Sequence, residues 1–536
     1  MNEHLKNLST QVTSGLLTRR EFVARAAALG VTAAVANSML ASTAQAQDAT
    51  PVAGGTFKMG LSGGESTNTQ DPALWQSQVP LAIGRLWGET LVRESRDGGG
   101  MEGLVAESWE GSNEAKTWRF KIREGITFSN GQPVTSQDVL RTLERHANEE
   151  SKSGALGIVK DITSMRTDGD DIFEVNLDIG NADLPDLMSD YHLMIQPDGG
   201  FGAETAAIGT GAYVMEDFEP GVRATATRRE GYWGGDQTVT AHYDRIEIIV
   251  LNDATARTAA LQSGQVDTIN AVDPKIAKLL DRAPTLTVRN VSGRGHYVFI
   301  AHVDTAPFDN LDLRLALKYA CNRQELVDKI LQGYGGVGND MPINAAYPLF
   351  DDTIPQREFN LEKAAEHYKK SGHDGSPIIL RTADGAFAGA VDAAALYQQS
   401  CLAAGIPLEI KREPNDGYWS EVWNVQPFCC SYWGGRTTQD QMYTTAYSSD
   451  ADWNDTRWKR EDFDAMLIEA RAELDEVKRK EIYSKMGRML AEEGGVILPM
   501  FNDFIDASSN EVLGYKVDPN GPLMNYYSFK HTWKAA

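Results

Sequence analysis

Hydrophobic and polar positions follow two different rhythms along most of this chain. Some short runs alternate at every second residue, as in 117–122, which is typical of a half-exposed strand. Longer runs repeat apolar residues every three to four positions, as in 360–371, which is typical of an amphipathic helix. Strand-like and helix-like runs follow one another between residues 56 and 500. This order predicts an α/β protein with mixed sheets flanked by helices.

Capping and turn residues indicate where these elements begin and end. Thr135 and Asp138 have the spacing of a capping box, Asp273-Pro274 starts a helix with proline at its first position, and Gly372 ends a helix. The expected strands are 56–61, 117–122, 126–128, 245–251, 296–302, 378–381, 408–411 and 496–500. Two helices are expected to start at 135 and 273. Further helices are expected at 253–263, 360–371 and 392–404, and two more within 458–493, separated by a break near 474–475.

The stretch 425–436 combines apolar, aromatic and basic residues at the end of a predicted strand. Residues 425–433 form a mostly apolar run that includes Cys429 and Cys430, Gly434-Gly435 form a turn, and Arg436 follows. Such a strand end presents an aromatic face and a guanidinium to one cavity, which suits a small-molecule site. A core strand with a surface loop is the alternative. Tryptophans at 419, 423, 433, 453 and 458 fit either a ligand site or a large core.

The N-terminus has the pattern of an export signal. Residues 18–25 contain the twin arginines Arg19 and Arg20, a small-residue apolar run covers 26–40, and Ala44-Gln45-Ala46 matches an A-x-A cleavage site. We expect 1–46 to be a twin-arginine signal that is removed after Ala46. An amphipathic N-terminal helix is the alternative.

Size, charge and cysteine content narrow the class of protein. The length of 536 residues suggests two or three domains, and the net charge of −24 disfavours nucleic acid and anionic lipid as partners. It does not determine the charge of a ligand, because a pocket can carry a local field of opposite sign. The four cysteines, Cys321, Cys401, Cys429 and Cys430, allow disulfides in an exported protein, but free buried thiols are equally compatible with the sequence.

An ordered set of motifs resembles the family 5 extracellular solute-binding proteins, which are the dipeptide- and oligopeptide-binding components of ABC importers. Gly209-Thr210-Gly211-Ala212-Tyr213 is similar to the GTGPY of that family, with Ala212 in place of proline. The other matching runs are 106–109 (AESW), 118–131 (WRFKIREGITFSNG), 134–139 (VTSQDV), 229–233 (REGYW), 244–249 (DRIEII), 264–267 (GQVD), 308–309 (FD), 313–317 (LRLAL) and 323–326 (RQEL).

This resemblance implies a two-lobe periplasmic-binding-protein fold of type II, in the large cluster with an extra inserted subdomain. Lobe I would comprise 47–86, 218–294 and 504–536, with 87–217 as the inserted subdomain. Lobe II would comprise 295–503. The two crossings, near Gly295 and Asp503, would form a two-segment hinge that closes the lobes over a ligand.

The resemblance also implies the partners and the location. The ligand would be a peptide or peptide-like solute, and the protein partners would be the permease subunits of an ABC importer at the inner membrane and, during export, the twin-arginine translocase. We expect a periplasmic monomer that is not an enzyme, with no catalytic residue, cofactor or metal site and no nucleic-acid partner.

The candidate ligand site departs from the peptide-binding pattern at one position. In peptide-binding relatives, an aspartate three residues after a strand-end tryptophan pairs with the α-amino group of the ligand. Counting from Trp433, that position is Arg436, which favours a carboxylate or phosphate unless it points to solvent. Asp440 would be a substitute acceptor if the loop is longer here. The expected ligand-binding residues are Arg294, Tyr297, Tyr432, Trp433, Gly434, Gly435, Arg436 and Asp440.

Three other chemistries remain open from the residues. An anionic non-peptide solute or a metal chelate would fit the same fold, since some relatives carry nickel complexes or haem. Gly60-Leu61-Ser62-Gly63-Gly64 matches the G-x-S-x-G of serine hydrolases, but no helix start follows it. His296 and His302 lie on one face of a predicted strand without a typical metal-ligand spacing.

Overall fold

The computed structural model describes residues 50–96, 100–148, 150, 152–202, 205–473 and 475–535. The predicted export signal and its cleavage site lie outside these residues. Within the described part, no helix is both long and apolar enough to cross a membrane.

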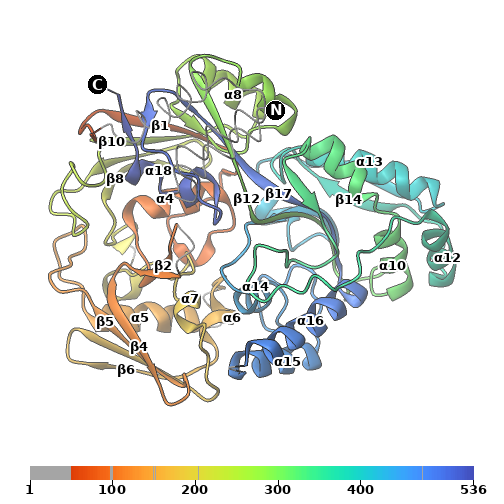
Figure 1. The fold of residues 1–536 in the computed structure, drawn as a ribbon, viewed down its shortest axis with the longest axis horizontal. Helices are drawn as coiled ribbons and strands as arrows, with labels where there is room; N and C mark the ends of the chain where they lie inside the picture. Colours follow the sequence, from red (N-terminus) through yellow and green to blue (C-terminus); the bar gives the residue numbers. More distant parts are fainter. Residues whose placement is uncertain are drawn as a thin grey trace, which may run out of the picture.

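One large mixed sheet runs through the molecule and connects its two halves (Figure 1). Eleven of the described strands form it, and ten of them follow the order β15-β14-β16-β12-β17-β11-β1-β10-β9-β8, while β13 pairs with β17. Their bounds are β1 Thr56–Leu61, β8 Tyr213–Glu219, β9 Arg223–Arg228, β10 Arg245–Val250, β11 Thr268–Ile269, β12 Leu286–Ala301, β13 Gly335–Val337, β14 Ile378–Thr382, β15 Leu408–Arg412, β16 Phe428–Trp433 and β17 Val496–Ser509.

The helices begin and end where the capping residues predict. The Thr135 backbone N–H donates to Asp138 Oδ2 (2.9 Å), Asp273 accepts from the Lys275 N–H (2.9 Å), and Gly372 ends a helix at φ +66°. The longer helices are α4 Gln78–Trp87, α5 Ser136–Ala147, α8 Ala254–Gln262, α9 Pro274–Leu280, α10 Leu311–Tyr319, α12 Leu361–Ser371, α13 Ala390–Ala403, α14 Gln439–Ala446, α15 Glu461–Ala472 and α16 Glu476–Glu493.

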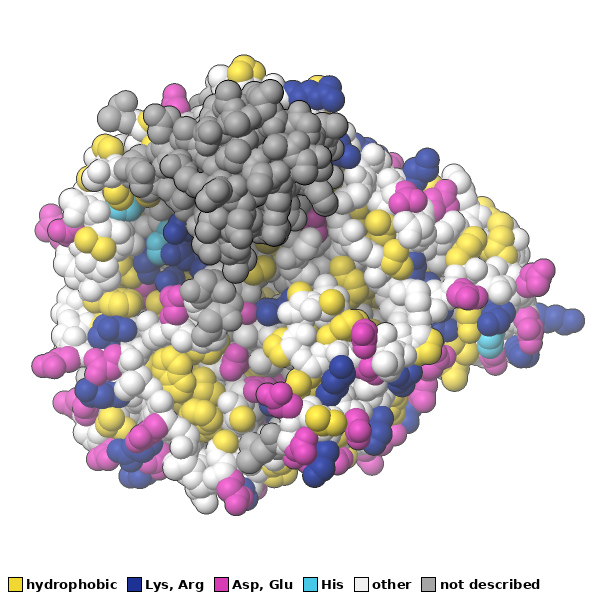
Figure 2. Space-filling model, viewed as in Figure 1, with side chains coloured by type: hydrophobic (Ala, Val, Ile, Leu, Met, Phe, Trp, Pro, Cys, Tyr) yellow, Lys and Arg dark blue, Asp and Glu magenta, His cyan; other side chains and the backbone are white. Residues whose placement is uncertain are grey.

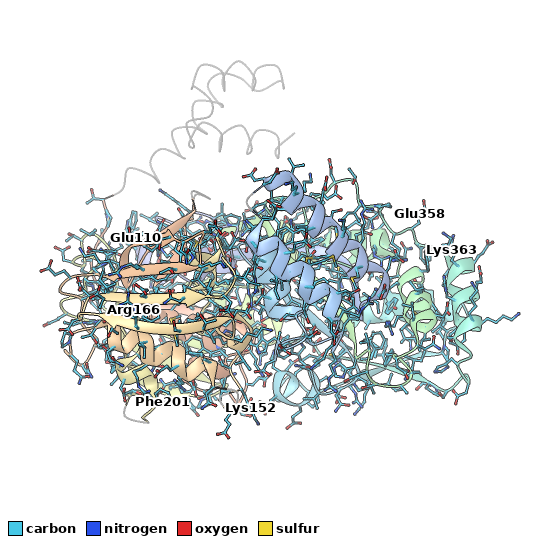
Figure 3. All side chains as sticks on the ribbon, turned by 90° about the horizontal axis from the view of Figure 1, so that it is seen from below. Glu110, Lys152, Arg166, Phe201, Glu358 and Lys363 are labelled. Atoms are coloured by element: carbon cyan, nitrogen blue, oxygen red, sulfur yellow. The ribbon has the colours of Figure 1, made fainter. Side chains whose placement is uncertain are left out.

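A separate four-stranded antiparallel sheet forms a smaller unit in the N-terminal third of the chain. Its order is β4-β5-β7-β6, with bounds Ala106–Ser112, Thr117–Ile122, Ile172–Leu177 and Ile162–Asp168. Together with α5, α6 (Leu156–Val159) and α7 (Leu184–Leu187), these strands bury their own hydrophobic cluster, and we call this the small-sheet unit. It carries Glu110 and Arg166 at one end of the molecule, whereas Lys363 of α12 lies at the other (Figure 3).

Two further units share the large sheet. The first unit packs α4 and the C-terminal helices α17 (Pro522–Asn525) and α18 (Ser528–His531) against β1 and β8–β10. The second unit, residues 296–501, buries the largest cluster, around β14, β16 and α13. β8 pairs with β9, so residues 213–217 lie in the large sheet, and the end of the inserted subdomain, which the resemblance sets at 217, stays a prediction.

β12 and β17 are the two long strands that pass between the first and second units. Leu286–Ser292 pairs with the C-terminal part of β17, and the second half of β12, from His296, pairs with its N-terminal part. The register shifts between Ser292 and His296, so the backbone of β12 is irregular at Gly293, Arg294 and Gly295. The sheet therefore has a local break in its ladder at the point where the units meet.

Two details differ from the sequence-based expectation. The predicted strand 126–128 forms only an isolated bridge between Thr127 and Pro133, with hydrogen bonds from the Phe128 N–H to the Gln132 carbonyl (2.8 Å) and from the Val134 N–H to the Ile126 carbonyl (3.1 Å). Strands β12 and β17 are also longer than expected. The predicted break between the two helices near residue 475 is confirmed, since α15 ends at Ala472 and α16 begins at Glu476.

Candidate functional site

A cavity of about 190 Å³ lies where the first, small-sheet and second units meet. This is ample room for a small molecule, because a single water needs only about 10–15 Å³. Seven of the eight residues predicted from the sequence line it, namely Arg294, Tyr297, Tyr432, Trp433, Gly434, Gly435 and Arg436. Because these residues line one cavity, they are in position to contact a ligand. Their role as ligand-binding residues stays a prediction.

The aromatic wall of the cavity comes from two paired strands of the second unit. In the ladder between β12 and β16, Tyr297 lies opposite Tyr432 and His296 lies opposite Trp433. The Tyr297 ring stacks on Phe387 (centroids 4.3 Å apart), and the Tyr432 ring contacts Trp419 edge-on at 5.1 Å. Cross-strand pairing thus brings together two aromatic residues that are 135 positions apart in the sequence.

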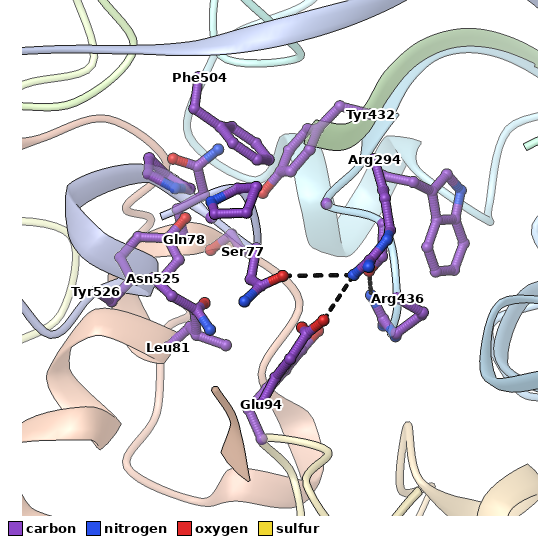
Figure 4. A pocket seen from close by; sticks show the side chains of 18 of the residues that line it. Ser77, Gln78, Leu81, Glu94, Arg294, Tyr432, Arg436, Phe504, Asn525 and Tyr526 are labelled. Atoms are coloured by element: carbon purple, nitrogen blue, oxygen red, sulfur yellow. Dashed lines mark hydrogen bonds and ion pairs between the residues drawn. The ribbon is translucent and has the colours of Figure 1, made fainter. Parts of the chain in front are cut away.

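Gly435 allows the chain to turn directly after this wall. Its φ is +84°, and a Cβ atom there would lie 2.4 Å from Arg294 Cβ. Both the backbone conformation and the close approach therefore require glycine. The turn brings Arg294 and Arg436 to the same part of the cavity, where Figure 4 shows them near Glu94.

Arg294 already has partners for its charge. Its Nη1 donates to Glu94 Oε1 at 2.7 Å and lies 3.4 Å from Asn520 Oδ1, and its Nε donates to the carbonyl of Ala346 at 3.2 Å (Figure 4). The ion pair with Glu94 links the irregular segment of β12 to β2 (Val92–Glu94), which lies beside the small-sheet unit. Arg294 therefore closes one side of the cavity.

Arg436 is held differently. Its Nη1 donates to the carbonyl of Gly435 at 2.7 Å, and its guanidinium carbon lies 5.6 Å from the Trp433 ring centroid and 5.7 Å from that of Tyr191. Its nearest carboxylate oxygen is Asp190 Oδ2, 3.8 Å from Nε. The Arg436 side chain is 9% exposed, so the expectation that it would point to solvent, which was the alternative, does not describe its position.

Asp190 comes from the small-sheet unit and is fully buried. Its Oδ1 accepts from the backbone N–H of His192 at 3.1 Å and lies 2.6 Å from His192 Nδ1. Burial opposes ionisation, but His192 and the charge of Arg436 lower the pKa of Asp190 to about 2. The carboxylate is thus charged at neutral pH and faces Arg436 across the boundary between units.

Asp440 does not line the cavity, and its proposed use as an amine acceptor needs correction. It sits in the first turn of α14, is completely buried, and accepts a hydrogen bond from Arg471 Nε at 2.7 Å. Thr438 caps that helix, so the chain turns inward two residues before Asp440. Its carboxylate therefore neutralises a structural arginine.

A buried carboxyl group supports the tryptophans behind the wall. Asp455 Oδ2 accepts hydrogen bonds from Trp423 Nε1 (2.9 Å) and Trp433 Nε1 (3.1 Å). Burial raises the pKa of Asp455 to about 7, and the two indole hydrogen bonds only partly offset that increase. Trp419, Trp423, Trp433 and Trp453 all line the cavity, whereas Trp458 packs on Phe463 in the core.

Several lining residues were missed by the sequence reasoning. They include Ser77 and Gln78 at the start of α4, residues 189–191, residues 502–505 and residues 519–522. The run Pro519-Asn520-Gly521-Pro522 carried a loop signal, and binding residues concentrate on loops. Nothing in the spacing along the chain indicated that these segments would meet Arg436.

The C-terminal part of this wall adopts an unusual backbone. Leu523, Met524, Asn525 and Tyr526 have φ values of 51°, 60°, 52° and 63°, in the left-handed region that costs non-glycine residues roughly 1–2 kcal/mol each. Asp506 of β17 holds this turn by accepting from the Leu523 N–H at 2.5 Å. Strain of this kind is common at functional sites, and here Asn525 and Tyr526 line the cavity.

The other candidate chemistries do not assemble in the described residues. After Ser62 the chain turns and reaches a 3-10 helix only at Pro72–Leu74, so the strand–turn–helix of a nucleophile elbow is absent there. No group of three or more His, Cys, Asp or Glu side chains in the described part is placed to hold a metal ion. All four cysteines are buried and free.

Comparison with known proteins identifies the family and the fold. Residues 100–455 match the bacterial extracellular solute-binding proteins, family 5 Middle. The chain is 23% identical over 461 residues to di/tripeptide-binding protein 1 of Pseudomonas aeruginosa, which covers 79% of this chain and 84% of that protein. It is also 23% identical over 474 residues to the nickel-binding protein NikA of Staphylococcus aureus, and this match covers 84% of this chain and 90% of that protein.

Solved structures agree on the architecture. The periplasmic binding protein AgaA of A. tumefaciens R10, solved with agropinic acid, superposes with a TM-score of 0.82 at 21% identity, covering 90% of this chain and 99% of that chain. DppA of Helicobacter pylori, solved with the peptide STSA, gives a TM-score of 0.80 at 18% identity, covering 92% and 100%. The fold is that of the two-lobe periplasmic binding proteins of type II, as the sequence resemblance implied. The chain belongs to the bacterial extracellular solute-binding proteins of family 5, and it is a binding protein and not an enzyme.

Proposed function

We propose that this protein captures a peptide or peptide-like solute between two closing lobes and delivers it to the permease subunits of an ABC importer. The observation that carries the proposal is the cavity at the meeting point of three units, lined from each of them by polar and aromatic side chains. Relatives named for dipeptides or di/tripeptides support the choice of solute class.

In this proposal the first and small-sheet units form lobe I (47–86, 218–294 and 504–536, with 87–217 inserted), and lobe II comprises 295–503. The hinge lies at the irregular segment of β12 around Gly293–Gly295 and at Asp503 of β17. A broken ladder supports this location, because fewer backbone hydrogen bonds resist a change in φ and ψ there.

The same proposal includes the route and the location. A twin-arginine signal would take the folded chain through its translocase, be removed after Ala46, and leave a monomer in the periplasm. The acidic composition supports a freely soluble exported chain, and acidic and basic side chains are interspersed on the face shown in Figure 2.

The test combines mass spectrometry with a cavity-filling variant. Protein exported by its own cells should release a small solute on denaturation, and cells lacking the protein should lose uptake of that solute. Gly434 lines the cavity, and a Cβ there would meet nothing within 4 Å, so Gly434→Trp should fill the cavity and abolish both retention and uptake. Val239→Trp, at a position 68% exposed and remote from the cavity lining, is the matched control. Retention and uptake unaffected by Gly434→Trp would refute this site.

A further inference from the structure

We propose that the solute carries a carboxylate and that the free edge of the Arg436 guanidinium, formed by Nε and Nη2, binds it. This inference rests on the proposed function, because it names the chemistry of a solute in the same cavity. The inference is based on the contacts of this guanidinium, because neighbouring residues contact its two faces and Nη1 but form no hydrogen bond with the Nε–Nη2 edge.

Two aromatic rings and one carbonyl fix the orientation of the guanidinium. The rings of Trp433 and Tyr191, which come from different units, lie 5.6 and 5.7 Å from its central carbon. Nη1 is bound to the carbonyl of Gly435 at 2.7 Å. Arg436 therefore cannot swing freely, and its orientation is set before any ligand arrives.

The remaining edge is buried and lacks a hydrogen-bond partner among the described residues. Neither Nε nor Nη2 of Arg436 makes a hydrogen bond with any described residue, although the side chain is only 9% exposed and lines the cavity. These two nitrogens present parallel N–H groups on one side of the planar group. That spacing matches the two oxygens of a carboxylate, which forms a bidentate, charge-assisted pair.

Asp190 does not fill this edge. Its Oδ2 lies 3.8 Å from Nε, beyond hydrogen-bonding distance, and this oxygen makes no hydrogen bond within the described residues. Its other oxygen is occupied by His192. Asp190 therefore attracts Arg436 across the boundary between units but does not accept a hydrogen bond from Nε or Nη2. The negative charge of Asp190 should weaken the binding of an anion at the same edge.

The other charged residues of the cavity lining mostly have partners. Glu94 pairs with Arg294 at 2.7 Å, and Asp503 accepts from Ser292 Oγ at 2.6 Å and from Asn290 Nδ2 at 3.0 Å. Four arginines and three acidic residues line the cavity, in a chain with a net charge of −24. Arg93 is itself paired with Glu102 at 2.8 Å, so an anionic group would be attracted by Arg436 and not by a general excess of unpaired arginines.

A carboxylate fits this arrangement better than a phosphate. The edge offers two donors and one positive charge, which satisfy the two oxygens and single charge of a carboxylate. A phosphate dianion brings a third oxygen and a second charge, so it needs further donors that Arg436 alone does not supply. Inorganic phosphate is accordingly one arm of the test.

The experiment uses acetate and its neutral isostere acetamide as probes of the whole exported protein. Saturation-transfer NMR of the probe methyl group and the tryptophan fluorescence of the wall should both detect acetate binding to the wild type, with acetamide and phosphate binding at least about tenfold more weakly. Arg436→Gln should weaken acetate binding by about tenfold or more. Arg436→Lys should retain part of it, because the charge remains but the fork is lost.

A second variant separates recognition from loss of folding. Asp190→Asn removes the competing charge and should strengthen acetate binding severalfold, which general damage to the cavity would not do. Arg166→Gln, which alters an exposed arginine of the small sheet, is the control and should leave the affinity unchanged. Acetate that fails to bind the wild type, binds Arg436→Gln equally well, or binds no better than acetamide or phosphate would overturn the carboxylate proposal. Retention of an uncharged or cationic solute that Gly434→Trp abolishes would overturn it too, yet leave the proposed transport function intact.

Discussion

The proposed hinge strands and a set of ion pairs, here called the rim, connect the second unit to the rest of the molecule by different means. At the proposed hinge, β12 and β17 are continuous backbone, paired from Leu286–Ser509 through to Ile300–Val496, with register shifts between Ser292 and His296 and between Tyr297 and Phe299. At the rim, Asp161 and Asp183 of the small-sheet unit form ion pairs with Arg471 of α15 and Arg479 of α16, respectively. These helices lie beside α6 and α7, away from the crossing of β12 and β17 (Figure 1).

This difference predicts that the strands mainly determine the stability of the fold, whereas the ion pairs mainly determine how far the proposed lobes close. A sheet ladder with a buried core persists as long as the chain is folded, whereas ion pairs between units can separate into water at modest cost. We therefore expect changes in the hinge strands to reduce the free energy of unfolding. Changes at the rim should mainly alter the proportion of closed molecules.

Phe299→Ala should have the largest effect. Phe299 of β12 is fully buried and stacks on Tyr397 with centroids 4.7 Å apart. Removing the ring should lower the free energy of unfolding by about 3–5 kcal/mol, measured by urea denaturation. Small-angle scattering of the folded protein should be unchanged, and a more open folded state would contradict the separation of roles.

The pH dependence of stability should report the buried carboxyl group behind the cavity wall. Asp455 has a raised pKa of about 7, so the native carboxyl keeps a proton that the unfolded chain has already lost. The free energy of unfolding should therefore fall as pH rises from about 4 to about 7, by up to about 4 kcal/mol for this group. Urea denaturation at pH 5 and pH 8 should show a smaller decrease for Asp455→Asn.

The pH slope of Asp455→Asn should be reduced and not abolished, because burial also raises the pKa of Asp506 and of Asp518 to about 6. Burial also raises the pKa of Asp440, the partner of Arg471, and raises that of Asp186, near Asp183, to about 7, so carboxyl groups beside α15 and α16 should contribute to the remaining slope. Identical pH profiles for wild type and variant would exclude Asp455 as a source of the slope.

Arg479→Gln should have a smaller effect on stability and a visible effect on closure. It leaves Asp183, which is 16% exposed, without its cationic partner. We expect the closed form to lose about 1–3 kcal/mol, seen as a larger radius of gyration in small-angle scattering. Lys485→Gln, at an exposed position of the same helix, is the control, and an equal response of both variants would argue against a specific contact.

Asp161→Asn should have the smallest effect. Asp161 is 45% exposed, and Arg471 keeps its buried partner Asp440 when this carboxylate is removed. The change in the free energy of unfolding should be within about 1 kcal/mol in thermal or urea denaturation. A loss as large as that for Phe299→Ala would mean that the rim, and not the hinge strands, carries the stability.

The sequence by itself determined the elements, the family and one wall of the site. Local signals such as the Thr135–Asp138 cap, the Gly372 helix end and the break before Glu476 act over a few residues, so they could be read without tertiary information. The strand end at Trp433 and the turn at Gly435 likewise follow from neighbouring residues. The expected strand at 126–128 is reduced to an isolated bridge between Thr127 and Pro133, around the tight turn at Asn130-Gly131.

Only the tertiary structure decided which charges face the cavity. Asp440 and Arg436 are four residues apart, yet α14 turns Asp440 toward Arg471, while the rings of Trp433 and Tyr191 hold Arg436 at the cavity. Tyr191 and Asp190 reach this point from a different unit, some 245 residues earlier in the chain. The physical reason is that a side chain's partner depends on distance in space, and a sheet that joins residues 56 to 509 sets those distances globally.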